Sequence, residues 1–466
     1  MDFNNGVLKQ ISDGDKWKLV DGVKAKKTQC VLNFFLARKR CLKENAWDNN
    51  LKLAEHSIKG NEPVILRIKG KIHIKPIKEL LSKSLFKNIK NSKRESYKKR
   101  NVDIWTEKGF LKIKNISAHK CNEKMVNIRT KNSCIDLTEH HSLVVNGKEL
   151  KPAEIGVGGE IENLPFPKIK GNILVDKDWA WTLGFFMADG SYTYNKSHRI
   201  QFINQKKDFL NRAKKGLAKV GINSHIIKTS KRKDNCYFLD VENPKIYYEI
   251  FNSFYTNDRE KKIPSFVFEW NKKSRIDFFY GFLAGDGGKT TNIVNFSQKS
   301  ATCVQGLLYL LSDIYKYRNV YKDKNKLGEW YHVSLYKKKQ KTIKKNLKTN
   351  VIDSMKFYNY DGIVYDVEVD DNIHTFSAGV GNVNVHNTDF FLRLSRTNWQ
   401  VYYTPEVKIV HDRNRNIGDY AEFRNRGFDY TIDMFKKNKI QKMISITGAV
   451  KELQQNGMKK YKIFNK

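Results

Sequence analysis

The sequence has few cysteines, no long apolar run and a shortage of acidic residues. Six cysteines occur in 466 residues, and no two of them form a Cys-x-x-Cys pair. This scatter is not that of a zinc site or an obvious disulfide framework, so we expect a reducing compartment. No segment approaches the roughly 20 apolar residues that a membrane-spanning helix requires, and the first 17 residues lack the apolar centre of a signal peptide. We therefore expect a soluble intracellular protein of the cytoplasm or nucleus, with no membrane partner.

Basic residues outnumber acidic residues by 87 to 49, which gives a formal net charge of +38. This balance is typical of proteins that bind polyanions, nucleic acid above all. A lysine-rich codon usage in an AT-rich genome would give the same composition, and charge alone does not separate the two explanations. Hydrophobic residues make up 40% of the chain and aromatic residues 12%, which is enough for packed cores. The length favours about three domains.

Strand-like patterns occur on both sides of a helical centre. Alternation of apolar and polar residues predicts strands in the segments 63–68, 71–77, 126–129, 130–145 and 363–369. A helical pattern begins at Asp178–Gly190, and helices and strands then alternate up to about residue 348. The basic segment 87–100 is expected to be a solvated loop or a short exposed helix. The two groups of strands predict one β domain that is split by an insertion.

The segment Val383–Thr388 contains the residue types that a self-cleaving junction requires. Asn387 can attack its own peptide carbonyl through its side-chain amide, which forms a succinimide and releases Thr388. His386 is placed to donate a proton to that step, and Thr388 supplies a nucleophilic hydroxyl. Taken alone, His-Asn-Thr is most often a surface turn, so the interpretation depends on other parts of the chain.

Three other segments fit the same interpretation. Ser57 is followed by a glycine-containing turn and a predicted hairpin, and this segment resembles the opening block of an intein. Thr138-x-x-His141 resembles the second intein block. The segment that contains Asp366 and His374 resembles the next-to-last block, and Val-His-Asn-Thr at the end of the strand region resembles the last. The four segments occur in the order that inteins have.

The intein resemblance implies a role for each of these residues. Ser57 would attack the preceding carbonyl in an N–O acyl shift, while Thr138 and His141 would polarise the peptide and protonate the departing amine. Asp366 and His374 would orient the groups at the two junctions. The bland alternative for Thr138 and His141 is a β-turn with a hydrogen-bonded surface histidine. Splicing of this kind needs no cofactor.

Two segments 97 residues apart repeat one pattern. Leu183–Gly190 reads Leu-Gly-Phe-Phe-Met-Ala-Asp-Gly, and Tyr280–Gly287 reads Tyr-Gly-Phe-Leu-Ala-Gly-Asp-Gly. Each copy has small residues four positions apart on one helical face, which lets two helices approach closely about a pseudo-twofold axis. Both copies resemble the LAGLIDADG motif of DOD-type homing endonucleases. A single copy would be interpreted as a core helix that ends in an Asp-Gly turn.

The endonuclease resemblance implies a metal-dependent nuclease, a monomer with an internal pseudo-dimer. Asp189 and Asp286 would lie side by side at the helix ends and bind Mg²⁺ for phosphodiester hydrolysis. Lys262, between the motifs, would stabilise charge. Basic loops would contact the phosphates of double-stranded DNA, and the expected target is the coding sequence that lacks the insertion.

The residues that flank the predicted insertion resemble a fragment of a family 2-type glycosyltransferase. On that resemblance Glu55 or Asp389 would be the catalytic base and His411 a possible metal ligand. A helix cap and a core histidine would explain the same residues. The fragment lacks the nucleotide-sugar-binding half of such enzymes, so this part of the chain would need that half to be supplied.

The sequence thus predicts a multidomain α+β protein. An all-β Hint (hedgehog/intein) splicing domain is split by an α/β LAGLIDADG endonuclease with a pseudo-twofold repeat, and α/β glycosyltransferase-like pieces flank it. The expected boundaries are 1–56 and 388–466 for the flanks, 57–165 and 349–387 for the splicing domain, and 166–348 for the endonuclease. Two alternatives are a DNA-cleaving protein that has lost splicing and a glycosyltransferase fragment with a splicing-dead insertion.

Overall fold

A computed structural model of the chain describes most of residues 57–386. The described ranges are 57–82, 85, 89, 95–98, 101–121, 124–193, 198–228, 236–290, 293–326, 328–337, 349–369 and 375–386, with the isolated strands β1 (Gly6–Gln10), β2 (Trp17–Asp21), β25 (Lys442–Met443) and β26 (Lys462–Ile463). The chain divides into two compact units. One unit is Leu53–Asn387, and the other combines Met1–Lys52 with Thr388–Lys466.

Strands from both ends of the larger unit form one 14-stranded sheet. The strands before the helical region are β3 (Ile58–Lys59), β4 (Pro63–Ile68), β5 (Lys71–Pro76), β6 (Glu95–Lys98), β7 (Val102–Thr106), β8 (Gly109–Cys121), β9 (Lys124–Thr130), β10 (Cys134–Thr138), β11 (Leu143–Val145) and β12 (Lys148–Leu150). The strands after it are β21 (Ile352–Asn359), β22 (Gly362–Val369), β23 (Thr375–Ala378) and β24 (Val383–His386). The order is β12-β11-β24-β23-β4-β7-β8-β22-β3-β10-β9-β21, with β5 on β4 and β6 on β8. The 3₁₀ helix η1 (Ile77–Leu80) and the helix α3 (Pro152–Ile155) accompany these strands.

The late strands insert between the early ones, so the sheet requires both parts of the chain. β22 lies between β8 and β3, and β23 and β24 lie between β4 and β11. Side chains from both parts share one apolar core, in which Ile58, Leu137, Tyr365 and Val385 are buried together. The split β domain that the sequence predicts is therefore present as a sheet, although its expected end points stay predictions.

Two segments differ from the sequence-based expectation. Within the basic segment 87–100, which was expected to be a loop or helix, Glu95–Lys98 is the strand β6 and pairs with β8. Its charged side chains interrupt the alternation of apolar and polar residues that would predict a strand. The strand β21 was not predicted, because its residues do not alternate cleanly between buried and exposed. β21 pairs only with β9 at the end of the sheet order, where alternation is not required.

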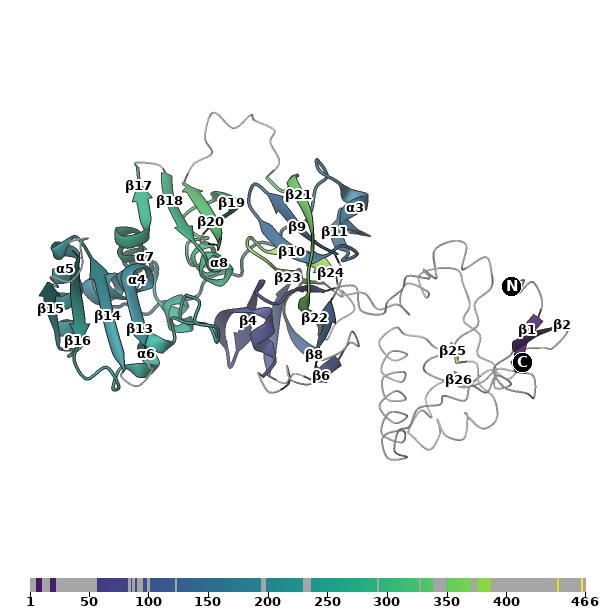
Figure 1. The fold of residues 1–466 in the computed structure, drawn as a ribbon, viewed down its shortest axis with the longest axis horizontal. Coiled ribbons are helices and arrows are strands. Elements are labelled where there is room, and N and C mark those ends of the chain that lie inside the picture. Colours follow the sequence, from purple (N-terminus) through teal and green to yellow (C-terminus); the bar gives the residue numbers. More distant parts are fainter. Residues whose placement is uncertain are drawn as a thin grey trace. The chain divides into compact units, whose positions relative to one another are not determined.

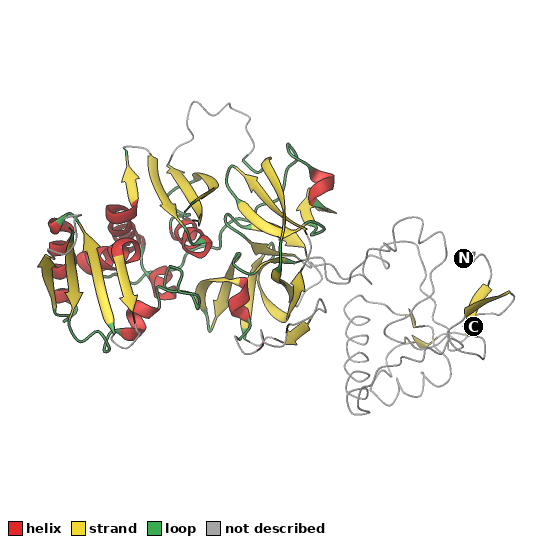
Figure 2. Ribbon diagram, viewed as in Figure 1, coloured by secondary structure: helices red, strands yellow, loops and turns green. Residues whose placement is uncertain are grey.

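The helical region repeats one arrangement twice. The first copy consists of α4 (Lys177–Asp189), β13 (Gly190–Thr193), β14 (Arg199–Asn204), α5 (Lys207–Lys219), β15 (Ser224–Lys228), β16 (Tyr237–Val241) and α6 (Tyr248–Asn252). The second consists of η2 (Ser265–Glu269), α7 (Lys272–Asp286), β17 (Gly287–Lys289), β18 (Ile293–Gln298), α8 (Ala301–Leu310), β19 (Tyr317–Asn325) and β20 (Gly328–Tyr336). The sheets have matching orders, β13-β14-β16-β15 and β17-β18-β20-β19. Figure 2 shows that the helices gather in this region, and Figure 1 shows α4 and α7 next to each other.

The helices α4 and α7 begin at side-chain caps and end where a strand begins. The carboxylate of Asp176 accepts hydrogen bonds from the backbone N–H groups of Asp178 and Trp179. Asn271 accepts one from Ser274 in the same way. Side-chain oxygens at this position stabilise the otherwise unpaired N–H groups of the first turn. No described helix has the length and the apolar character that crossing a membrane requires.

Glycines allow α4 and α7 to contact each other through their backbones. A Cβ on Gly184 would lie 1.7 Å from the carbonyl oxygen of Phe278, and a Cβ on Gly281 would lie 1.8 Å from that of Trp181. Each residue of one contact is 97 positions from its counterpart in the other, so the contact obeys the same pseudo-twofold symmetry as the sequence repeat. Any larger side chain at these two positions would push the helices apart.

Gly281→Ala should therefore destabilise the protein by about 3 kcal/mol, the upper part of the usual range for overpacking. Gly288→Ala is the matched control, since a Cβ there meets no atom within 4 Å. Chemical denaturation of both variants measures the difference. Equal stability of the two variants would contradict the close helix contact.

Candidate active sites

Ser57 lies between two of the predicted site residues. The strand that follows it, β3, is flanked by β10 and β22, with Leu137 and Tyr365 both opposite Ile58. Continuing these registers by one residue places Thr138 on one side of Ser57 and Asp366 on the other. Ser57, Thr138 and Asp366 are all buried. The fold thus brings together three residues that are far apart in the sequence.

Thr138 contacts the peptide bond that splicing would break. The backbone nitrogen of Ser57, which belongs to the peptide bond with residue 56, donates to Thr138 Oγ1 over 3.2 Å. The same hydroxyl lies 3.2 Å from the Ser57 carbonyl oxygen, and the Thr138 N–H donates to that oxygen over 2.9 Å. Ser57 Oγ is buried and has no hydrogen-bond partner among the described residues. Within the described part of the chain, the hydroxyl is therefore not engaged elsewhere.

The segment that follows Thr138 also contacts the last described strand. The His141 N–H donates to the Thr138 carbonyl over 2.9 Å, and the His386 N–H donates to the Ser142 carbonyl over 3.1 Å. Val385 pairs with Leu143. His141 is fully buried. The five-residue segment Thr138–Ser142 therefore contacts Ser57 at one end and His386 at the other.

Glu149 is a site residue that the sequence analysis missed. Its carboxylate Oε1 lies 3.0 Å from His386 Nε2, and both side chains are largely buried. The two groups form an ion pair when the imidazole is protonated. Glu149 lies on the short strand β12, which pairs with β11. No motif marks it, because its position beside His386 arises only from strand pairing. The carboxylate of Asp366 accepts from the N–H of Val367 over 2.7 Å.

Several predicted site residues lie outside the described residues, and their roles stay predictions. They are Glu55, His374, Asn387, Thr388, Asp389 and His411.

Asp189 and Asp286 lie beside each other at the ends of α4 and α7. A Cβ on Gly285, the residue before Asp286, would lie 2.7 Å from Asp189 Oδ2. Burial and the neighbouring Asp189 together raise the pKa of Asp286 to about 6, against the effects of Lys261 and of a hydrogen bond from Gln298. Burial also raises the pKa of Asp189, against the effect of a hydrogen bond from Asn204. The structure thus brings together the two carboxylates that the repeat predicts.

Each carboxylate accepts a hydrogen bond from an amide that the sequence analysis missed. Asn204 Nδ2 donates to Asp189 Oδ2 over 2.6 Å, and Gln298 Nε2 donates to Asp286 Oδ2. Asn204 is the last residue of β14, and Gln298 is the last residue of β18. The two amides thus occupy equivalent places in the two copies. The sequence could have indicated these two amides through their equivalent positions in the repeat, but those positions can be compared only when the strand ends are known.

The lysine next to the carboxylates is Lys261, and not the predicted Lys262. Lys261 Nζ donates to the carbonyl oxygens of Phe186 (2.8 Å) and Gly190 (2.6 Å), at the end of α4. Burial lowers the pKa of Lys261 to about 7, and Asp286 and Asp189 act to raise it. Burial lowers the pKa of Lys262, and the charges that act on this lysine are those of Glu79 and Lys75 in the β domain. The segment is extended, so adjacent side chains point in opposite directions.

The two aspartates fit a divalent cation. Carboxylate oxygens are the donors that hard cations such as Mg²⁺ prefer, and a cation removes the repulsion between two neighbouring acids. In the described part of the chain, no group of three or more His, Cys, Asp and Glu side chains could bind a metal ion. Asp189 and Asp286 would therefore hold the cation with further ligands from water and from the bound substrate.

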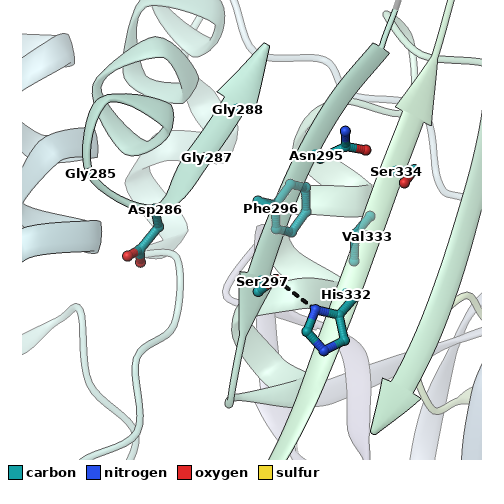
Figure 3. Close-up of a pocket in the computed structure, with 10 residues that line it drawn as sticks. All are labelled: Gly285, Asp286, Gly287, Gly288, Asn295, Phe296, Ser297, His332, Val333 and Ser334. Atoms are coloured by element: carbon teal, nitrogen blue, oxygen red, sulfur yellow. Dashed lines mark hydrogen bonds between the residues drawn. The ribbon is translucent and has the colours of Figure 1, made fainter. Parts of the chain in front are cut away.

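A polar groove of about 650 Å³ extends from Asp286 across the second sheet. Figure 3 shows Asn295 and Ser297 of β18 beside Ser334 and His332 of β20, with the Asp286 carboxylate directed away from these strands. Ser297 Oγ and His332 Nδ1 form a hydrogen bond of 2.7 Å. Hydroxyl, amide and imidazole groups in such a groove can bind a polar ligand that reaches the carboxylates.

Comparison with protein families gives a match in the first part of the helical region. Residues 177–254 match the model of a LAGLIDADG-like domain. This part of the chain is therefore similar to LAGLIDADG-like domains. The prediction of an enzyme domain of this kind is confirmed, and the chain has the mixed α/β fold that was expected with it. The match ends before α7, so the second copy of the LAGLIDADG-like arrangement is recognised here from its topology.

Curated relatives match much of the chain. A DNA polymerase of Acanthamoeba polyphaga mimivirus is 32% identical over 361 residues, which cover 72% of this chain and 20% of the polymerase. The replication factor C small subunit of Methanocaldococcus jannaschii is 28% identical, with coverage of 55% of this chain and 16% of that protein. Transcription initiation factor IIB of the same organism is 26% identical, with coverage of 72% and 50%. The chain thus spans at most half the length of these relatives.

Solved structures resemble the chain weakly. A transcription factor IIB Mvu mini-intein shares 12% identity, and the match covers 71% of this chain and 100% of the mini-intein with a TM-score of 0.26. I-DmoI in complex with DNA and Mn shares 16% identity over 34% of this chain and 89% of I-DmoI, with a TM-score of 0.27.

Divalent metal binding should weaken as the pH falls below about 6. The pKa of Asp286 is raised to about 6 and that of Asp189 is also raised, so protons compete with the metal in that range. Titration calorimetry with Mn²⁺ between about pH 5 and pH 8 measures this competition. Asp286→Asn should lower the affinity and flatten its pH dependence, while Asp323→Asn, on the exposed part of β19, should change neither. An affinity that is independent of pH would contradict the assignment.

Proposed function

We propose that residues 57–387 are an intein that removes itself from the chain and that carries a homing endonuclease. The observation that supports splicing most strongly is the position of Ser57, between Thr138 and Asp366 and with its peptide nitrogen on the Thr138 hydroxyl. An isolated β-turn would not bring these residues to one buried point. The LAGLIDADG-like domain supports the nuclease.

Splicing would begin at Ser57. Its Oγ attacks the carbonyl carbon of residue 56, a C–O bond forms, the C–N bond breaks, and the hydroxyl proton ends on the Ser57 amine. The Thr138 hydroxyl, 3.2 Å from that nitrogen, can donate to it as it becomes basic. The buried His141, in the same turn, is the proposed proton donor to the departing amine.

The second junction would complete the reaction. The Thr388 hydroxyl attacks the new ester and takes over residues 1–56, and Asn387 then cyclises and releases the Thr388 amine. An O–N shift restores a peptide bond between His56 and Thr388. His386, whose Nε2 lies 3.0 Å from Glu149 Oε1, is the proposed proton donor to the leaving amine.

The endonuclease would hydrolyse phosphodiester bonds in double-stranded DNA. A divalent ion at Asp189 and Asp286, with Mg²⁺ as the proposed one, would activate water and stabilise the leaving oxygen. Lys261, with a pKa near 7, can stabilise negative charge or exchange a proton near neutral pH. The polar groove on β18 and β20 supports contact with bases, and the excess of lysine and arginine supports phosphate binding.

The relatives support an insertion that is shared among unlike proteins. The polymerase and transcription factor IIB each match 72% of this chain. Residues 57–387 are 331 of the 466 residues, or about 71%. None of the three relatives described above is a glycosyltransferase, so the comparisons give no support to the predicted host and favour a replication or transcription protein. The glycosyltransferase interpretation of residues 1–56 and 388–466 stays a prediction.

Fresh expression should yield an excised piece of 331 residues and a joined product of 135 residues. Asn387→Ala should block release of the C-terminal flank but permit ester formation at Ser57, since cyclisation requires the side-chain amide. Intact mass spectrometry distinguishes the products. Recovery of only the intact chain at every temperature would remove the splicing proposal.

DNA cleavage should depend on Lys261 far more than on Lys262. Lys261→Met removes the buried amine beside the carboxylates and should slow cleavage by about a hundredfold or more, as the loss of one charge-stabilising group does in other active sites. Lys262→Met should slow it by less than about threefold.

Asp189→Asn and Asp286→Asn should abolish cleavage with Mg²⁺ and retain salt-sensitive binding.

The substrate for this assay is a duplex that carries the uninterrupted coding sequence around the codons for His56 and Thr388. Parental cleavage rates in both aspartate variants, or a larger defect in Lys262→Met than in Lys261→Met, would contradict the assignment.

A further inference from the structure

The endonuclease region contributes buried side chains to the two arms of the splice site. One arm is β10, which ends at Thr138, and the other is the segment from the β23–β24 turn to His386. The second half of that region, from β19 and α8, packs against β10 and against the turn between β23 and β24. β10 leads to Thr138, and β24 leads to His386. Cys134 and Val380, which pair with each other across the two arms, belong to the apolar core of the endonuclease.

Lys322 of β19 contacts the arm that carries Thr138. Its Nζ lies 2.7 Å from Asp136 Oδ2, and the two side chains are 9% and 3% exposed. Asp136 is two residues before Thr138 on β10. Its backbone N–H donates to the buried carboxylate of Glu62, in the turn that follows β3. A lysine of the endonuclease region thus pairs with the side chain of Asp136, the residue whose backbone N–H joins the Thr138 strand to the turn that follows the Ser57 strand.

Gln305 of α8 contacts the arm that carries His386. Its Oε1 accepts from the Gly381 N–H over 2.8 Å, and its Nε2 donates to Asn382 Oδ1. Gln305 and Asn382 are almost fully buried. Asn382 has a φ of 63°, a conformation that non-glycine residues adopt only when their surroundings stabilise it. The strand β24 begins at the next residue, so this turn sets where His386 lies.

Arg318 strengthens the same junction. It is partly buried, and its Nε donates to the Asn132 carbonyl over 3.0 Å while another guanidinium nitrogen donates to the Gly381 carbonyl over 3.2 Å. One side chain of β19 therefore joins the turn before β10 to the turn before β24. Buried carbonyls require such donors, because no water replaces them.

We propose that Lys322 and Gln305 are positioning residues for splicing, so that the endonuclease domain completes the splice site through its second half. Lys322 sets the N-terminal junction through Asp136 and β10, and Gln305 sets the C-terminal junction through the Gly381–Asn382 turn and β24. This inference rests on the proposed splicing function. It assigns to the nuclease domain a role that DNA cleavage does not require.

Two backgrounds of the full chain separate the two junctions. With Asn387→Ala, hydroxylamine cleaves the ester at Ser57 and releases residues 1–56, which measures the first step. With Ser57→Ala, the release of residues 388–466 measures asparagine cyclisation. Lys322→Met should slow the first step by about tenfold or more and the second by less than about twofold. Gln305→Leu should do the reverse.

Matched controls lie on the same elements or on the other half of the repeat. Lys324→Met removes an exposed lysine of β19, and Gln201→Leu removes a buried glutamine that contacts Asp240 within the first half. Both controls should splice as the parent does. Lys322→Arg should recover most of the first step, since it restores the charge. DNA cleavage by the Lys322→Met and Gln305→Leu variants should stay near the parental rate, which shows that the domain is folded.

Parental rates of both steps in both variants would overturn this inference while splicing by the parent stands. If each variant lost both splicing steps equally and also lost DNA cleavage, the inference would be overturned as well, because that result would mean general unfolding. A parent chain that does not splice would overturn the proposed function itself.

Discussion

The continuous β-sheet depends on a short set of backbone hydrogen bonds that joins the two ends of the helical region. Glu160 and Val351 form a β-bridge, the Ile161 N–H donates to the Asn350 carbonyl over 3.1 Å, and the Ile352 N–H donates to the Gly159 carbonyl over 2.8 Å. Because the ends meet, the strands on either side can pair as in an uninterrupted chain. Closing a longer loop adds little entropic cost, so the length between these ends matters much less than their separation.

The two candidate sites use burial in different ways. At the helix ends, two acids lie close together with a buried lysine, and the pKa values of all three move towards neutrality because the charged forms lose hydration. At the β-sheet, burial surrounds Ser57 with backbone contacts and keeps its hydroxyl without a competing partner among the described residues. The first site is suited to bind an ion, and the second surrounds the peptide nitrogen of Ser57 with buried groups.

The sequence was sufficient where a repeat or a periodic pattern reports the structure directly. The strand at Pro63–Ile68 and the pairing of Asp189 with Asp286 were predicted, because alternation and the 97-residue repeat are local signals. Glu149 and Lys261 were not. Glu149 reaches its partner through strand pairing. The choice between adjacent lysines depends on which face of an extended segment points to the helix ends, and no periodic pattern specifies that face.

The two halves of the repeat have the same topology but make different contacts with the rest of the protein. The contacts to the splicing arms described above come from β19 and α8, whereas Arg199, Gln201 and Asp240 of the first half bind one another within their own sheet. Under the proposed function, mutations in the first half are therefore constrained by DNA and by the contact with α7, but not by these arms. Under the proposed function, the second half must satisfy both the DNA and the splicing fold, so the two halves of the repeat are expected to change at unequal rates. A DNA target would then change first on the side that the first half reads.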